Sequence, residues 1–354
     1  MSDLLIRHGE VADVLNGQFG RGFAEDVADI IKKDGVKTVQ HAVVSSQFDA
    51  DRLDYMRRDR MMAGTQHAAI DFPWLIANLE IGAVETGVDD TPTGKIETFV
   101  LGPKAIHAAE AFVLGLFQLY PTVYFHKTTR GVEQIFTELL VRFVELVRQG
   151  HIAATGISAN HPLTKFALDP ENIDVALGLD DTVVWGALTL MSDASDPVLS
   201  SFSTRLRDRK LLRCFDIRTV VAHQLDPKSI NSDELIAEID ACCAKIENRL
   251  KEWAEERNRP KSDDSIRPPP SILVDSDKRS PYKPVNESKG PLDRINIRTE
   301  GSTLVDLKER SSVVAALKTF KLSRAYADRE DPTALDFIDK TVNEEIETCR
   351  TKAQ

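Results

Sequence analysis

Most of the first 255 residues carry apolar side chains at the spacing of helices rather than of strands. The segment "GFAEDVADIIKK" places four apolar residues on one helical stripe: Phe23, Val27, Ile30 and Ile31. A longer apolar pattern of the same period runs from residue 105 to residue 149 and contains Pro121. Proline lacks an amide hydrogen and clashes with the preceding turn, so the sequence predicts two helices that meet near Pro121.

Two further segments have local signals at their ends. Residues 232–256, "SDELIAEIDACCAKIENRLKEWAEE", predict another helix, and Ser232 is suited to cap its N-terminus. Residues 96–102, "IETFVLG", can form a strand of a hairpin because they follow the Gly-, Asp- and Pro-rich segment "ETGVDDTPTGK". Residues 34–40, "DGVKTVQ", are too short to assign.

The composition changes at residues 257–271, "RNRPKSDDSIRPPPS", where three consecutive prolines exclude a helix. Short segments typical of strands follow: "SILVDS", "DRINIRTE" and "STLVDLKE", and then a helical "SSVVAALKTF". The predicted fold is therefore mainly α with a smaller C-terminal α+β part. We expect a helical domain at 1–255, a linker or exposed loop at 256–281, and an α+β segment at 282–354.

Composition excludes several classes of protein. The chain has 354 residues, 42% hydrophobic and 29% charged, which is typical of a soluble globular protein. It contains neither a membrane-length apolar run nor a signal-like N-terminus, so we expect a cytoplasmic protein and no membrane partner. Four cysteines without a CxxC pair indicate neither a disulfide framework nor a zinc knuckle.

The formal net charge of −11 makes a nucleic-acid partner unlikely as a general role, because phosphate contacts need clustered Lys and Arg. One basic segment, "STRLRDRKLLRC", keeps a weaker nucleic-acid hypothesis open. At helical spacing its cations can form a stripe, or can lie over an acidic partner helix: Arg205, Arg207, Arg209, Lys210 and Arg213.

The run "SSQFDADRLDYMRRD" at residues 45–59 concentrates charges of both signs. Drawn as a helix, it gathers polar side chains on one broad face: Asp51, Arg52, Tyr55, Arg58 and Asp59. Leu53, Met56 and Arg57 point elsewhere. Carboxylates, a guanidinium and a phenol together can hold a hydrated metal ion and a phosphorylated sugar. The alternative is a solvated surface helix stabilised by salt bridges.

Two linked segments carry a resemblance to a known family. Residues 43–64, "VVSSQFDADRLDYMRRDRMMAG", and residues 119–136, "LYPTVYFHKTTRGVEQIF", resemble HD-domain phosphohydrolases, specifically the deoxynucleoside triphosphate triphosphohydrolase (dGTPase-like) branch. Looser similarity continues through "YKPVNESKGPLDRINI". The resemblance implies a helical HD-type core, a divalent metal such as Mg, Mn, Zn or Fe, a nucleotide substrate or effector, and a homo-oligomer.

The resemblance also assigns roles to individual residues. Asp51 matches a metal ligand, and Asp49 matches a supporting carboxylate beside the substrate. Arg52 falls where the family keeps a basic residue that contacts substrate phosphate. The sugar-binding positions are matched by Tyr55, Asp59 and Tyr124. The pair His126 and Lys127 follows the matched tyrosine, and we expect it to serve structure before chemistry.

Two features depart from the family. Leu116 stands where many relatives keep an arginine eight residues before the tyrosine. HD domains also bind metal through a His and a His-Asp pair, whereas no histidine in this chain is followed by aspartate. The residues that follow the eight histidines are Gly9, Ala42, Ala68, Ala108, Lys127, Ile152, Pro162 and Gln224. One aspartate cannot hold a catalytic divalent ion, so a metal cofactor is doubtful in this chain as given.

Two functions remain open. The first is an HD phosphohydrolase that, in its complete form, converts a dNTP into deoxynucleoside and triphosphate. This reading expects upstream codons that encode the missing histidine motifs, because the first helix shows an apolar stripe typical of a domain interior: Leu4, Leu5, Val11, Val14 and Leu15. The second is a non-catalytic nucleotide-binding or regulatory relative that has lost the metal site.

Overall fold

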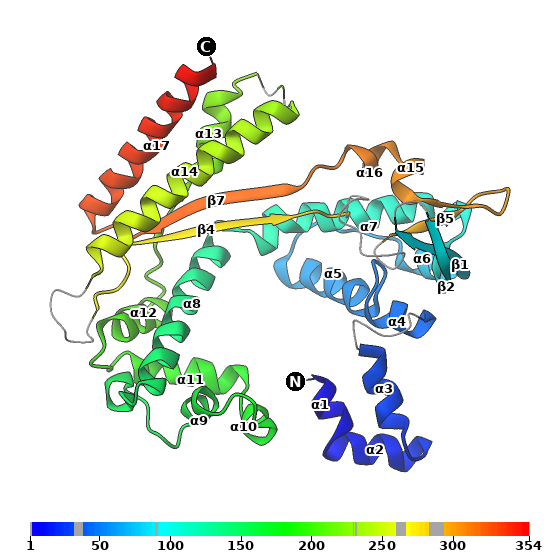
Figure 1. Ribbon diagram of the computed structural model, residues 1–354, viewed down its shortest axis with the longest axis horizontal. Coiled ribbons are helices and arrows are strands. Elements are labelled where there is room, and N and C mark those ends of the chain that lie inside the picture. Colours follow the sequence, from blue (N-terminus) through cyan, green and yellow to red (C-terminus); the bar gives the residue numbers. More distant parts are fainter. Residues whose placement is uncertain are drawn as a thin grey trace. The chain divides into compact units, whose positions relative to one another are not determined.

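The computed structural model describes residues 2–31, 38–88, 91–228, 230, 232–259, 267–282 and 294–353 (Figure 1). Helices dominate, and short strands form two small sheets, which confirms the predicted mainly α fold with a smaller α+β part. Among the described helices, none combines the length and the apolar character needed to cross a membrane.

The chain divides into two compact units that are each discontinuous in sequence. Unit 1 contains residues 1–124 and 279–320, and unit 2 contains residues 125–278 and 321–354. The sequence-based division into 1–255, 256–281 and 282–354 did not anticipate that each unit is built from two separate stretches of the chain. Its domain boundaries remain a prediction. Within the expected linker, residues 272–279 form a strand, so only part of that segment is irregular.

Unit 1 holds mostly short helices. They are α1 (Ser2–Arg7), α2 (Glu10–Phe19), α3 (Phe23–Ile31), α4 (Val39–Val44), α5 (Ala50–Ala63), α6 (Phe72–Ala77), α7 (Ile106–Leu119), α15 (Leu307–Arg310) and α16 (Ser312–Ala316). The apolar stripe predicted from Phe23 to Ile31 coincides with α3. A core of buried apolar side chains lies between α5, α6, α7, Tyr282 and the segment 294–317, with Phe112 and Leu119 fully buried in it.

The sheet of unit 1 has the strand order β1-β2-β5-β6. Strands β1 (Leu79–Val88) and β2 (Thr91–Leu101) pair antiparallel, as predicted for a hairpin containing residues 96–102. Strand β5 (Asn296–Arg298) pairs parallel to β2, and β6 (Leu304–Asp306) pairs antiparallel to β5. Buried Ile295 and Ile297 therefore join the sheet to the same core as α7.

The predicted interruption at Pro121 is confirmed. A 3-10 turn at Pro103–Ala105 precedes α7, which ends at Leu119. One π-helical turn then covers Tyr120–Tyr124, and α8 (Lys127–Arg148) follows it. A π turn is an uncommon element that occurs often at functional sites. Here it carries two tyrosines, Tyr120 and Tyr124.

Unit 2 contains the longest of the described helices, namely α8, α14 (Asp233–Arg257) and α17 (Pro332–Ala353). Its other helices are α9 (Pro162–Leu168), α10 (Ile173–Leu177), α11 (Asp181–Met191), α12 (Pro197–Arg207) and α13 (Ile217–Leu225), with a 3-10 turn at Ile152–Thr155. Its sheet has the order β3-β7-β4, with β3 (Arg213–Asp216), β7 (Phe320–Ala327) and β4 (Ile272–Arg279). Helices α14 and α17 pack against each other through an apolar cluster (Figure 1).

Of two sequence-based predictions in unit 2, the structure agrees with one and differs from the other. Ser232 caps α14 as predicted, because its hydroxyl accepts the Leu235 amide at 3.2 Å. The basic segment does not form one helical stripe, because α12 ends at Arg207 and Arg209 has a left-handed φ of 54°. Arg205 is instead paired with Asp328.

Candidate functional site

Helix α5 presents the charged run, and its two ends are fixed by side-chain and backbone caps. The Asp49 carboxylate accepts the Arg52 amide at 2.6 Å at the N-terminus, and Gly64 ends the helix in the left-handed conformation. Met56 is fully buried, and Leu53 packs against the same core. Tyr55 packs against this core as well, so the face of α5 that carries Tyr55 and Asp59 borders its buried side.

Tyr124 is the centre of a cluster on this face of α5. Its hydroxyl donates a hydrogen bond to Asp59 Oδ2 at 2.7 Å. The ring of Tyr55 meets the ring of Tyr124 edge-on, with centroids 6.2 Å apart, and the ring of Tyr120 lies 6.0 Å away at an angle of 61°. The structure therefore brings together three of the predicted sugar-binding residues, Tyr55, Asp59 and Tyr124.

The phenols of this cluster are held in their neutral form. Burial raises the pKa of Tyr55 to about 12, and the positive charge of Arg52 opposes part of that rise. Burial also raises the pKa of Tyr120 and that of Tyr124, and for Tyr124 the hydrogen bond to Asp59 adds to the effect. At neutral pH each phenol is a hydrogen-bond donor, and Asp59 is the acceptor.

The second predicted group lies at the start of α5. Arg52 lies beside Asp49, with Nε 3.8 Å from Oδ2, and donates a hydrogen bond to the side chain of buried Gln47. Burial raises the pKa of Asp49, while the Arg52 amide and the Arg52 charge oppose that rise. Asp51 is exposed, and its charge raises the pKa of both Asp49 and Tyr55. Asp51 is therefore close to both groups, although the shared cleft and the roles of these residues remain predictions.

His126 and Lys127 belong to the other compact unit. His126 is exposed and caps α8, because its Nδ1 accepts the Thr128 amide at 3.3 Å. Lys127 is the exposed first residue of α8. The structure thus shows His126 as a helix cap, and the roles of the pair remain predictions.

Other residues on α5 and α7 do not join the cluster. Arg58 pairs with Asp54 at 2.8 Å on the exposed surface, and its place on the site face remains a prediction. Arg57 lies over the ring of Phe72. Leu116 is buried in the core, so a phosphate contact at that position has no counterpart here.

The described residues do not fit a divalent metal by themselves. All eight histidines lie within the described ranges, and in those ranges no three His, Cys, Asp or Glu side chains come together as a metal site would require. Asp51 and Asp49 supply two carboxylates, of which Asp49 already caps the helix. Catalytic metal sites need several protein ligands, so no step of a reaction is assigned to a metal here.

Sequence reasoning missed two members of the cluster, Tyr120 and Gln47. The four-residue interval between Tyr120 and Tyr124 was a usable signal, since residues four apart share a helix face. No comparable signal marked Gln47, because its position under Arg52 depends on the loop before α5.

Comparisons with known proteins place these observations in a family context. Residues 93–159 match the family described as the HD associated region. The uncharacterized protein YwfO of Bacillus subtilis is 26% identical over 210 residues, covering 59% of this chain and 45% of YwfO. The uncharacterized protein MJ1154 of Methanocaldococcus jannaschii is 29% identical over 118 residues, covering 33% of this chain and 24% of MJ1154. The chain thus spans less than half the length of these two relatives.

Solved structures share the fold. A phosphohydrolase from Bacteroides thetaiotaomicron superimposes with a TM-score of 0.59 at 22% identity, over 93% of this chain and 74% of that one. A hypothetical protein from Aquifex aeolicus also gives 0.59, at 18% identity, over 96% of this chain and 69% of that one. The comparisons thus show the HD associated region at residues 93–159 and a fold shared with these solved structures.

Proposed function

We propose that this chain carries the nucleoside-binding wall of an HD-superfamily phosphohydrolase that acts on dNTPs. In the complete site the products are a deoxynucleoside and triphosphate, and the metal ligands other than Asp51 come from outside the described residues. The observation that carries the proposal is the hydrogen bond from Tyr124 to Asp59, with the ring of Tyr55 edge-on to that of Tyr124.

Each group of the cluster suits one part of a nucleotide. The second oxygen of Asp59 can accept a sugar hydroxyl while Oδ2 accepts Tyr124, since a carboxylate has room for several donors. The rings of Tyr55 and Tyr124 offer an apolar wall for a deoxyribose. Arg52 supplies a positive charge near this wall for phosphate.

Binding without metal tests the proposal. We expect wild-type protein in chelator to bind dNTPs, and Asp59→Asn to weaken binding about tenfold, the factor for losing one charge-assisted hydrogen bond. Asp54→Asn is the matched control, because this substitution removes the same charge from the exposed side of α5. Equal affinity of both variants, or no binding by the wild type, would contradict the proposal.

A non-catalytic nucleotide-binding or regulatory relative is the second candidate. It is favoured by the lack of a three-ligand group among the described residues. Both candidates predict nucleotide binding and the same loss in Asp59→Asn. They differ in turnover, because only the first gains metal-dependent triphosphate release when the missing ligands are added.

A further inference from the structure

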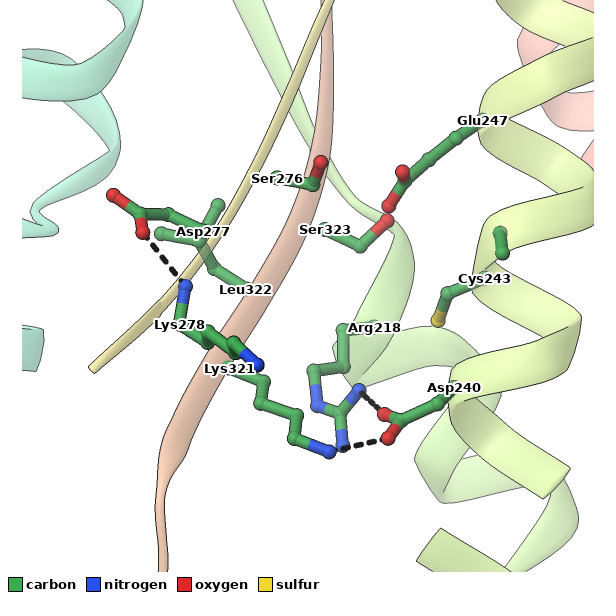
Figure 2. Close-up of a pocket in the computed structure, with 11 residues that line it drawn as sticks. Arg218, Asp240, Cys243, Glu247, Ser276, Asp277, Lys278, Lys321, Leu322 and Ser323 are labelled. Atoms are coloured by element: carbon green, nitrogen blue, oxygen red, sulfur yellow. Dashed lines mark hydrogen bonds and ion pairs between the residues drawn. The ribbon is translucent and has the colours of Figure 1, made fainter. Parts of the chain in front are cut away.

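A cavity of about 390 Å³ lies in unit 2 between helices α13 and α14 and strands β4 and β7 (Figure 2). It is formed within one compact unit and shares no residue with the Tyr124 cluster. Helix α14 supplies three of its polar side chains at the spacing of one helix face, namely Asp240, Cys243 and Glu247. An inference about this cavity is therefore independent of the proposed function.

One end of the cavity has an excess of positive charge. Arg218 Nη1 lies 2.5 Å from Asp240 Oδ1, and Lys321 Nζ pairs with Asp240 Oδ2 (Figure 2). Two cations share a single carboxylate, so one unit of positive charge is left uncompensated. The charges of Lys321 and Arg218 oppose the effect of burial and lower the pKa of Asp240, so the carboxylate stays ionised.

The other end has an excess of negative charge. Glu247 is partly buried and forms no ion pair with a Lys, Arg or His in the part of the chain that the structure describes. The hydroxyl groups of Ser276 and Ser323 lie at this end beside it (Figure 2). Asp277 points away from Glu247 (Figure 2), accepts the Lys278 amide at 2.7 Å, and lies 3.6 Å from Arg130 Nη1, an arginine that also pairs with Asp275 and Glu133.

Cys243 lies between the two ends, and the charges at both ends affect the pKa of its thiol. Burial raises the pKa of its thiol to about 11, the positive charge of Arg218 opposes that rise, and the negative charge of Glu247 adds to it. Both charged ends therefore lie within electrostatic reach of the same side chain. The Cys243 thiol is neutral at physiological pH and forms a wall of the cavity rather than a nucleophile.

We propose that this cavity binds a small zwitterion of the amino-acid class. The acid group of the ligand lies against Arg218 and Lys321, and its ammonium group lies against Glu247. A zwitterion compensates the excess charge at both ends. A simple anion is repelled by Glu247, and a simple cation is repelled by Arg218 and Lys321. Because like charges in a partly desolvated site are costly, the cavity discriminates against either singly charged ligand.

Calorimetric titration with glycine, 4-aminobutanoate and 6-aminohexanoate tests this assignment. The singly charged counterparts of the longest probe are hexanoate and hexylamine. We expect at least one amino acid to bind, and the matched acid or amine to bind at least about tenfold more weakly. No binding by any of the three amino acids would overturn the proposal, as would equal binding by an amino acid and its matched acid.

Variants separate the site from non-specific binding. Glu247→Gln keeps the shape of the side chain and should weaken the amino acid at least about tenfold while leaving the acid-only probe unchanged or tighter. Glu252→Gln removes the same charge from an exposed position of α14 and should change nothing. Equal effects of the two variants would contradict the assignment. Circular dichroism of both variants checks that neither change unfolds the protein.

Discussion

The hydroxyl of Tyr124 donates to Asp59 Oδ2 at 2.7 Å, although the two residues are 65 positions apart in the chain. This contact joins α5 to the π turn that follows α7, so the two segments that resemble the family meet at one hydrogen bond. Tyr55 lies edge-on to the same ring. The cluster is thus a consequence of how two distant helices pack, and it fixes the orientation of the Asp59 carboxylate.

The five tyrosines of the chain should give an unusual alkaline titration. The pKa of each is raised, chiefly by burial: Tyr55, Tyr120, Tyr124, Tyr282 and Tyr326. The rise in absorbance at 295 nm should therefore occur at a higher pH in the folded protein than in the denatured protein. Titration curves that coincide for native and denatured protein would contradict this prediction.

The same shifts predict the pH dependence of stability. The folded pKa of Tyr55, about 12, lies above the unfolded value of 10.0. The folded state therefore binds this proton more tightly, and the stabilisation is complete below pH 10 and is lost as the pH rises toward 12. Between pH 10 and 12, the free energy of unfolding of Tyr55→Phe should therefore fall less steeply with pH than that of the wild type. Parallel pH profiles for the two proteins would show that Tyr55 does not contribute.

Two glycines in unit 2 should respond to alanine in opposite directions. A Cβ at Gly131 would lie 2.9 Å from Cε1 of Tyr326, whose ring is fully enclosed, so Gly131→Ala should cost about 1–3 kcal/mol. Gly186 lies within α11, and a Cβ there would meet nothing within 4 Å, so Gly186→Ala should stabilise by up to about 1 kcal/mol. Urea unfolding followed by circular dichroism measures both. A stabilising Gly131→Ala would disprove the close packing of α8 on β7.

Protein containing residues 1–354 alone should release no triphosphate from dNTPs in the presence of Mn²⁺. The physical reason is that the described residues bring together no three metal-ligating side chains. A colorimetric assay for triphosphate measures turnover, and Asp51→Ala is the reference. Robust Mn²⁺-dependent activity that Asp51→Ala abolishes would mean that ligands from outside the described residues complete the site.

Helices and caps were predictable because their signals are local. Ser232 before α14 and Pro121 between α7 and α8 act within one turn of the chain, and the structure confirms both. The strand β4 was recognised from "SILVDS", although the surrounding segment was assigned to a linker. That each unit combines two separate stretches of the chain was not predictable, since it depends on contacts between residues far apart in sequence.

The candidate site was predictable only in part. Spacing on α5 and the resemblance indicated Tyr55, Asp59 and Tyr124, and the structure brings these together. Spacing alone also placed Arg58 on that face, but Arg58 pairs with Asp54 because a long side chain can reach the next turn. The cavity between Arg218 and Glu247 gave no sequence signal, because its walls come from four separate elements.

The most direct test of the central claim is a binding cycle that removes one hydroxyl from the nucleotide and one charge from the protein. The affinities of a 2′-deoxynucleoside triphosphate and its 2′,3′-dideoxy counterpart are measured with wild type and with Asp59→Asn. If Asp59 accepts the 3′-hydroxyl, losing that hydroxyl should weaken the wild type about tenfold and should scarcely affect the variant. The same loss in both proteins would contradict the account.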